Sequence, residues 1–178
     1  RLLLHDRVAR EPAVTLTFEL AVPEDAPALA ALHGEVAADL TRQYGPGHWS
    51  SSASEAAVVR LVTTSRAIVA KAGGSVVGTV RLAGKRPWAI NPRFFAPVRR
   101  PLYVVDMAVR PSSQRAGLGR MLLEQAMQIA RVWPGDSLRL DAYDAPAGAG
   151  AFYVKCGFSE VGRAEYRGVP LIYYERLL

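Results

Sequence analysis

The sequence has a single cysteine and no long apolar run. One cysteine, Cys156, excludes an internal disulfide and fits a reducing cytoplasm, where we expect the protein to work. No apolar stretch approaches the roughly 20 residues that a membrane-spanning helix needs, so no membrane partner is expected. The apolar run at residues 2–4 is too short for a signal peptide, and because the chain does not begin with Met, residues are expected to be missing upstream.

Repeats, low-complexity tracts and Pro/Gly/Ser-rich linkers are absent as well. The 178 residues are 50% hydrophobic and 21% charged, which is typical of one well-filled globular domain. We therefore expect a single domain over residues 1–178, with residues 1–13 as an irregular N-terminal extension. The three histidines, His5, His33 and His48, lack metal-ligand spacing, so no metal is expected.

Negative charge is the scarcer sign. The chain has 22 Lys and Arg against 16 Asp and Glu, and its formal net charge is +6. Such a surplus suits an anionic partner (nucleic acid, a membrane surface or a phosphorylated small molecule), or it reflects a compositional bias towards Arg and Ala. The arginines are scattered, apart from Arg99 and Arg100, which argues against nucleic acid as the partner.

Hydrophobic periodicity predicts alternating strands and helices. The expected elements are a strand at 14–22, a helix at 23–40, a helix from a Ser52–Glu55 capping box to Thr64, two strands around Gly73-Gly74, an irregular connection at 85–101, a strand at 102–111, a helix from Leu118 to Trp133, a strand at 137–143, a helix at 146–156, and strands at 158–165 and 170–177. This order predicts an α/β fold: a mixed, mostly antiparallel central sheet with a local parallel pair, between 102–111 and 137–143, and helices on both faces.

Gly117 and Gly119 stand where a helix should begin, although glycine costs a helix interior about 0.5–1 kcal/mol relative to alanine. The free N–H groups at a helix start favour phosphate. The glycines would let a pyrophosphate approach the backbone, or they serve the turn sterically. Arg115 and Arg120 would add charge-assisted contacts or are simply solvated. The stretch is neither the dinucleotide-binding fingerprint nor a Walker loop.

Two motifs in this order resemble those of the GNAT acetyltransferase superfamily. Gln114-x-x-Gly117-x-Gly119, directly after the Val109-x-Pro111 strand exit, is similar to the Q/R-x-x-G-x-G/A signature. Residues 147–158 are similar to the A-x-x-L/F-Y-x-x-x-G-F element, through Ala149, Phe152, Tyr153, Gly157 and Phe158. The resemblance extends from about Thr15 to Glu175.

This resemblance implies a GNAT-like fold and an N-acetyltransferase that moves an acetyl group from acetyl-CoA to a primary amine by direct attack on the thioester. The residues that it implies for acetyl-CoA binding are Met107, Ala108, Val109, Gln114, Arg115, Ala116, Gly117, Leu118, Gly119, Arg120, Ala149, Phe152 and Tyr153. One departure is Pro146, where the family often has asparagine near the cofactor, because proline offers neither a side-chain amide nor a backbone N–H. That departure keeps open a degenerate CoA-binding sensor or scaffold as the alternative.

Tyr153 and Asp106 are the candidate catalytic residues. The resemblance makes Tyr153 the general acid at the cofactor sulfur. A phenol is a weaker acid than a thiol, so we expect mostly a hydrogen bond from it; the alternative is an aromatic packed in the core. Asp106 has apolar neighbours, which suggests partial desolvation. A carboxylate is a weak base, so we expect it to act through a water relay, or else to cap a strand bulge or pair with an arginine.

The acceptor is a small-molecule or protein amine, and the sequence does not separate the two. His48, Trp49 and residues 86–100 are specificity candidates or ordinary packed loops. Asp141, Tyr143 and Asp144 form an acidic cluster that would attract a cationic amine. Residues 169–178 are apolar enough for a homodimer interface or an inner strand, and Cys156 is expected to be a small buried hydrophobe rather than a nucleophile.

Overall fold

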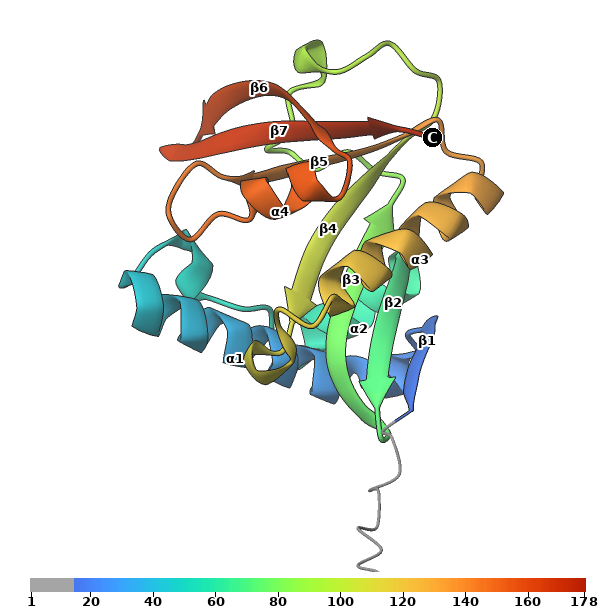
Figure 1. Cartoon of the computed structure of the whole chain (residues 1–178), viewed down its shortest axis with the longest axis vertical. Helices are drawn as coiled ribbons and strands as arrows, with labels where there is room; N and C mark the ends of the chain where they lie inside the picture. The colour runs from blue at the N-terminus through green and yellow to red at the C-terminus, as the bar shows by residue number, and fades with distance from the viewer. Residues whose placement is uncertain (1–14) are drawn as a thin grey trace, which may run out of the picture.

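A seven-stranded mixed sheet runs through the computed structural model, which describes residues 15–178 (Figure 1). The strands are β1 (Leu16–Leu20), β2 (Arg66–Ala72), β3 (Ser75–Ala83), β4 (Pro101–Val109), β5 (Ser137–Tyr143), β6 (Ser159–Tyr166) and β7 (Val169–Leu177). Their order is β1-β2-β3-β4-β5-β7-β6, and β4–β5 is the one parallel pair among them. The expected mixed sheet with a local parallel pair is confirmed. The extension expected at residues 1–13 lies outside the described residues.

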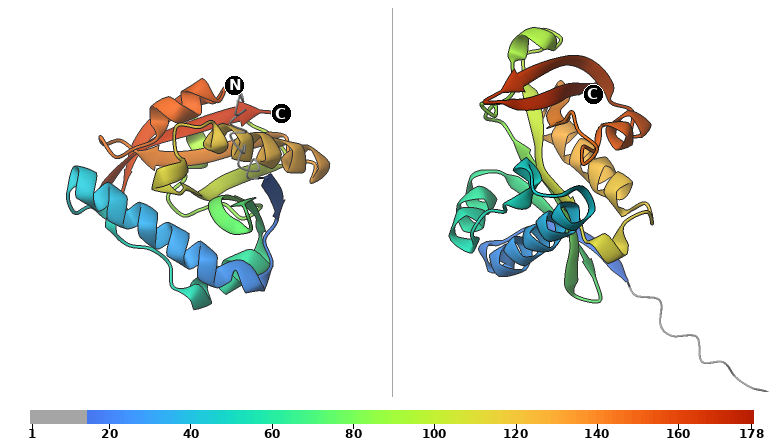
Figure 2. Two further views of the ribbon diagram at one scale, coloured as in Figure 1. Left: turned by 60° about the horizontal axis from the view of Figure 1, so that its bottom comes forward. Right: turned by 90° about the vertical axis from the view of Figure 1, so that its left-hand side faces the viewer.

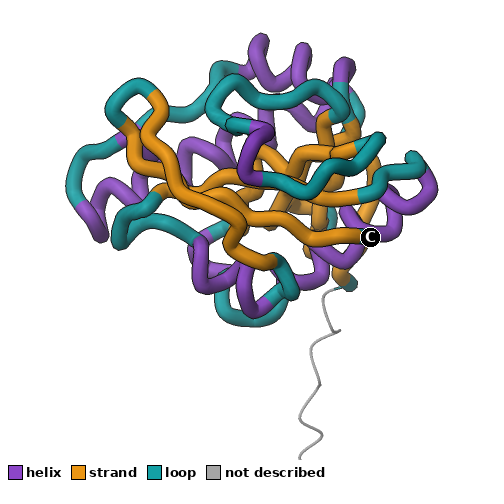
Figure 3. Tube along the Cα trace, turned by 90° about the horizontal axis from the view of Figure 1, so that it is seen from above, coloured by secondary structure: helices purple, strands orange, loops and turns teal. Residues whose placement is uncertain are grey.

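Helices cover both faces of the sheet, as expected (Figures 2 and 3). The helices are α1 (Ala26–Tyr44), α2 (Glu55–Thr64), α3 (Leu118–Val132) and α4 (Gly150–Lys155). Helices α1 and α2 bury one apolar cluster against the sheet, and α3 and α4 bury another on the opposite face. The stripe of Leu118, Leu122 and Ala126 on α3 is buried in that second cluster, because residues three to four apart share one helix face.

Two predicted helix starts are wrong. Helix α2 is capped by Ser54, whose hydroxyl accepts a hydrogen bond from the backbone N–H of Ala57 at 3.3 Å, and not by Ser52. Helix α4 begins at Gly150 rather than at residue 146, because a turn comes first, in which the N–H of Gly148 donates to the carbonyl of Ala145 at 2.8 Å.

Strands β4 and β5 pair only at their beginnings. The parallel register joins Pro101–Tyr103 to Ser137–Arg139, and the two strands then diverge, which gives the sheet a fork (Figure 1). Beyond residue 103, β4 stays paired with β3 on its other side. The second half of β4 therefore presents an open backbone edge toward the gap, where its polar groups have no strand to bond.

A buried ion pair lies at the base of this fork. Arg139 on β5 donates from Nε to Glu175 on β7 at 2.9 Å, and each side chain is 6% exposed. The same carboxylate accepts from the N–H of Ala96 at 3.0 Å, so the pair also fixes the irregular connection between β3 and β4. Strand β7 lies between β5 and β6, and the inner-strand reading of residues 169–178 therefore holds.

A β-bulge interrupts β4 beside the open edge. Thr79 pairs with Ala108 and Arg81 with Val105, so two residues of β4, Asp106 and Met107, oppose the single residue between the two β3 partners. Asp106 has a φ of +50°, in the left-handed region. The bulge changes the direction of the side chains at the point where the fork opens.

Candidate functional site

A groove of about 640 Å³, which we call the fork groove, lies along the open edge of β4. The predicted cofactor-binding residues that line it are Met107, Ala108, Val109, Gln114, Arg115, Gly117, Gly119, Arg120, Ala149, Phe152 and Tyr153. Two predicted residues do not line it. Ala116 is exposed, and the side chain of Leu118 is buried in the core beneath α3. The structure thus brings two motifs far apart in sequence to one cavity.

The N-terminus of α3 lies at this groove and is not capped by a side chain. Gly117 is its N-cap residue, with a φ of +84°, and no acidic residue occupies the first turn. The first intrahelical bond comes from Met121 to the carbonyl of Gly117, so the N–H groups before it have no helical acceptor. A Cβ added at Gly117 would meet no atom within 4 Å, which leaves open space over these amides. The geometry suits an anion.

Gly119 has a different reason to be glycine. A Cβ there would lie 3.1 Å from Phe152 and 3.3 Å from Met107, closer than ordinary van der Waals contact. The close packing of α3 against α4 and β4 therefore favours glycine at this position, because the ends of the Phe152 and Met107 side chains would have to shift to admit a Cβ. The left-handed φ of +84° favours glycine at residue 117, whereas close packing favours it at residue 119.

Side chains of the signature loop hold the local structure. The amide nitrogen of Gln114 donates to the carbonyl of Val109 at 3.1 Å and so ties the loop to the end of β4. Arg120 donates to the carbonyl of Lys155 at 3.1 Å, which joins α3 to the end of α4. Arg115 is exposed, and its guanidinium is available to a ligand in the groove.

Tyr153 is buried where α4 faces the fork. Its side chain packs on Phe152, Phe158 and Tyr174, and its hydroxyl points at the sulfur of Met107, 3.9 Å away. Burial raises the pKa of Tyr153, and the nearby Asp141 raises it further, because both oppose a phenolate charge. The phenol stays protonated and is a hydrogen-bond donor at the groove.

Asp106 does not have the desolvated surroundings expected from its apolar neighbours. Its side chain is 43% exposed, because the bulge turns it away from the core, and Arg81 donates to one carboxylate oxygen from Nε and Nη2, both at 2.7 Å. The alternative of a carboxylate at a strand bulge, paired with an arginine, is the one observed. Arg81 is in turn held by the hydroxyl of Ser65 at 3.2 Å.

A second cavity of about 270 Å³, which we call the α1–α2 pocket, adjoins the fork groove. Both cavities are lined by Val36, Leu40 and Met107, so they meet beside the bulge of β4. Asp106 and Arg81 line the pocket, and so does His33, which sequence reasoning dismissed because it tested histidines only for metal spacing. The sequence feature that could have identified His33 as a pocket residue is its position on the buried stripe of α1, one turn before Val36.

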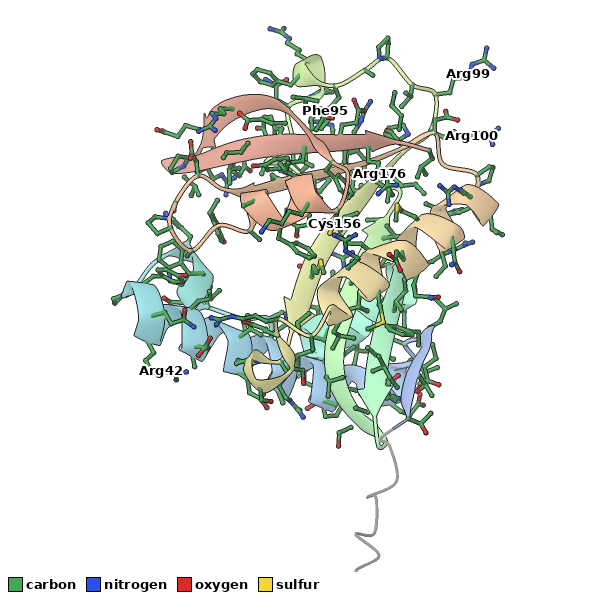
Figure 4. The ribbon with its side chains drawn as sticks, in the orientation of Figure 1. Arg42, Phe95, Arg99, Arg100, Cys156 and Arg176 are labelled. Carbon is green, nitrogen blue, oxygen red and sulfur yellow. The ribbon has the colours of Figure 1, made fainter. Side chains whose placement is uncertain are left out.

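Of the predicted specificity residues, Trp49 lines the α1–α2 pocket and His48 does not. Tyr143, predicted as part of the acidic cluster, also lines this pocket, and its hydroxyl donates to the carbonyl of His48 at 3.3 Å. Residues 86–100 line neither cavity, and Figure 4 shows Arg99 and Arg100 on the outer edge, away from the fork.

The predicted acidic cluster is partly neutralised. Asp144 forms an ion pair with Arg163 at 3.0 Å. Burial raises the pKa of Asp141 on β5, whereas a backbone hydrogen bond lowers it. Burial raises the pKa of Tyr143 and keeps its phenol uncharged, so this cluster attracts a cation less strongly than two free carboxylates would.

Five further residues line the groove but were not predicted from the sequence to bind the cofactor: Val36, Leu40, Ala147, Lys155 and Cys156. Cys156 is 7% exposed, and Figure 4 shows it at the gap between α4 and β4. Burial raises the pKa of its thiol, which fits the expected small buried hydrophobe. Pro146 is exposed and does not line the groove. The position where the family often has asparagine therefore offers no hydrogen-bonding group to the groove.

Residues 15–178 contain no cluster of three or more groups suited to hold a metal ion. No helix within this described part is long and apolar enough to cross a bilayer.

The forked sheet, the groove along β4 and the uncapped start of α3 agree with the GNAT-like fold expected from the two sequence motifs. The chain belongs to the Acetyltransferase (GNAT) family, whose model matches residues 35–158. No curated protein sequence gives a significant match.

Solved structures share the fold. The ribosomal-protein-alanine N-acetyltransferase from Brucella melitensis is 20% identical, with a TM-score of 0.70 over 91% of this chain and 99% of that one. An N-acetyltransferase from Staphylococcus aureus Mu50 is 18% identical, with a TM-score of 0.70 over 92% and 98%. PaiA N-acetyltransferase from Thermoplasma acidophilum, solved in complex with coenzyme A, is 14% identical, with a TM-score of 0.69 over 92% and 99%.

Proposed function

We propose that the protein transfers the acetyl group of acetyl-CoA to a primary amine by direct attack of the amine on the thioester. One observation carries the proposal: the open edge of β4 and the uncapped start of α3 face the same groove. The first offers hydrogen bonds to an extended chain of amides, and the second offers an anion site. Pantetheine and pyrophosphate, joined in one molecule, have the matching chemistry.

The residues proposed to hold acetyl-CoA act mainly through their backbone. The strand edge at Met107, Ala108 and Val109 would bond the pantetheine amides, and the amides of Leu118 and Gly119 would hold the pyrophosphate. The guanidiniums of Arg115 and Arg120 add positive charge, and Phe152 and Ala149 form the apolar wall. Bound there, acetyl-CoA would supply an activated acetyl thioester.

Tyr153 is proposed to donate a hydrogen bond to the departing sulfur. Its hydroxyl lies at the fork, where it contacts the sulfur of Met107. The raised pKa of Tyr153 means that the proton stays on the phenol. Tyr153 therefore stabilises the thiolate by the hydrogen bond, without complete proton transfer.

Asp106 is proposed to receive the positive charge of the approaching amine. Arg81 binds one carboxylate oxygen, and the carboxylate lines the α1–α2 pocket beside the meeting point of the two cavities. With a lysine-like pKa, only about one alkylamine in a thousand is neutral at pH 7.4. A water relay from the amine to Asp106 is the second role open to this carboxylate.

The rival function is a degenerate module that holds coenzyme A as a sensor or scaffold. Release of free thiol from acetyl-CoA, measured with a panel of small amines and free peptide N-termini, separates the two. The proposal expects release that depends on an acceptor and an acetylated product. Binding of acetyl-CoA with no acceptor-dependent release over the whole panel supports the rival. The single buried cysteine supports the cytoplasm as the place of action.

A further inference from the structure

A histidine lies on the wall of the α1–α2 pocket with no structural task among the described residues. His33 shares one face of α1 with Leu29, Val36, Ala37 and Leu40, all of which line the pocket. That face is otherwise apolar, so a histidine there is costly unless its ring has a partner. No hydrogen bond from the described part of the chain is among the causes that shift the pKa of its imidazole. The ring nitrogens can therefore form hydrogen bonds with a molecule that occupies the pocket.

The groups around His33 keep the imidazole neutral. Burial lowers its pKa, Asp106 raises it and Arg81 lowers it again. The titratable and charged groups that face the pocket are Arg81 from β3, Asp106 from β4 and Tyr143 from β5, whereas α2 contributes only the apolar Val58, Leu61 and Val62. Because Arg81 binds one oxygen of Asp106 and a carboxylate is a weaker base than an imidazole, His33 is the strongest base that the pocket offers at neutral pH.

Size and lining restrict what the pocket accepts. About 270 Å³ is below the roughly 300–1,000 Å³ typical of drug-sized ligands. Apart from His33, the lining residues of α1 and α2 are aliphatic, and Trp49 and Tyr143 add aromatic rings in edge-to-face contact, 5.8 Å between centroids. Besides His33 and Tyr143, the polar lining residues are Ser51, Ser52, Thr79, Arg81 and Asp106, and Asp106 adjoins Met107, which also lines the fork groove. This arrangement suits a compact apolar body that carries one amine.

We propose that the α1–α2 pocket binds a small primary amine with an apolar body and that His33 accepts the proton that its nitrogen loses. This inference rests on the proposed acetyl transfer. The neutral amine forms the C–N bond to the acetyl carbon, and the C–S bond breaks. One N–H proton goes to His33 and then to water, while the departing thiolate takes a proton from solvent. The products are the amide and the free thiol, so atoms and electrons balance.

The acceptor class is tested with three probes: 2-phenylethylamine, spermidine and a ten-residue peptide with a free N-terminus. We expect kcat/KM to be at least about tenfold higher for 2-phenylethylamine. Ala53→Trp, at the exposed rim of the pocket, should raise KM for this amine and leave the Kd of acetyl-CoA unchanged. Ala56→Trp, exposed nearby on α2 but outside the lining, is the control. Preference for spermidine or the peptide overturns the inference.

The role of His33 is tested by the pH dependence of kcat with saturating 2-phenylethylamine. The wild type should lose activity below pH 6.5, as the imidazole becomes protonated and can no longer accept a proton. His33→Gln should lower kcat by about 100-fold or more and remove this acid limb, while acetyl-CoA still binds. His48→Gln, an exposed histidine outside the lining, should retain the limb. An unchanged profile in His33→Gln overturns the role.

Two further results keep the test independent of folding and of the donor site. Imidazole added to His33→Ala should restore part of kcat, which a merely destabilised protein would not show. Failure of acetyl-CoA to bind the wild type would remove the proposed function itself. If the peptide is acetylated and kcat is the same in His33→Gln as in the wild type, the proposed acetyl transfer is supported and this inference is contradicted.

Discussion

The hydroxyl of Tyr153 points at the sulfur of Met107 across 3.9 Å, and this contact joins α4 to the bulge of β4. It lies where the fork groove and the α1–α2 pocket meet, since Met107 lines both. A donor molecule in the groove and an acceptor in the pocket would therefore meet within reach of Tyr153. The position of the phenol gives the first prediction.

Tyr153→Phe removes the hydroxyl and keeps the ring that packs on Phe158 and Tyr174. We expect kcat to fall at least about tenfold, because the thiolate loses its donor. The Kd of acetyl-CoA should stay the same, since the groove keeps its shape. Steady-state thiol release and calorimetric titration measure the two quantities. Unchanged turnover would rule out the hydrogen-bonding role.

Gly117→Ala and Gly168→Ala form a matched pair. Both glycines have a positive φ, +84° and +80°, with nothing within 4 Å of an added Cβ, but only Gly117 lies at the groove. Each variant should lose about 1–2 kcal/mol of unfolding free energy through left-handed strain. Only Gly117→Ala should raise the Kd of acetyl-CoA, because its methyl occupies the space over the α3 amides. Equal Kd values in both variants would contradict the anion site.

Asp106→Asn and Asp106→Ala separate charge from backbone strain. The φ of +50° is tolerated by Asn and opposed by Ala. We expect Asp106→Ala to be about 1 kcal/mol less stable to urea than Asp106→Asn. Both should raise KM for the amine, since the carboxylate proposed to attract it is lost and Arg81 is left with an uncompensated positive charge. A stability order of Ala above Asn would be inconsistent with the left-handed bulge.

The base of the fork depends on Arg139 and Glu175. Glu175→Leu leaves a buried guanidinium without its partner and should cost about 3–5 kcal/mol of unfolding free energy. The double variant Arg139→Met/Glu175→Leu should recover part of this loss, because no buried charge remains. Urea unfolding of the two single variants and the double variant measures the coupling. Additive losses would mean that the two side chains act independently.

The order of elements was predictable from the sequence because each strand and helix has its own hydrophobic period. The start of α3 at Gly117 was predictable because the glycine interrupts a helix pattern there. The bulge at Asp106 could be named from the sequence only as one alternative, since it depends on the pairing of β4 with Arg81 and Thr79 of β3. For the same reason the desolvation expected for Asp106 was wrong: its partner is 25 residues away in the chain. His33 joins Asp106 and Arg81 only in the folded protein.

Calorimetric titration of the wild-type chain with acetyl-CoA tests the central claim most directly, because every proposed step begins in the fork groove. We expect one site per chain with a Kd in the micromolar range, weakened in Gly117→Ala and retained in Gly168→Ala. No heat of binding up to millimolar acetyl-CoA would contradict the account.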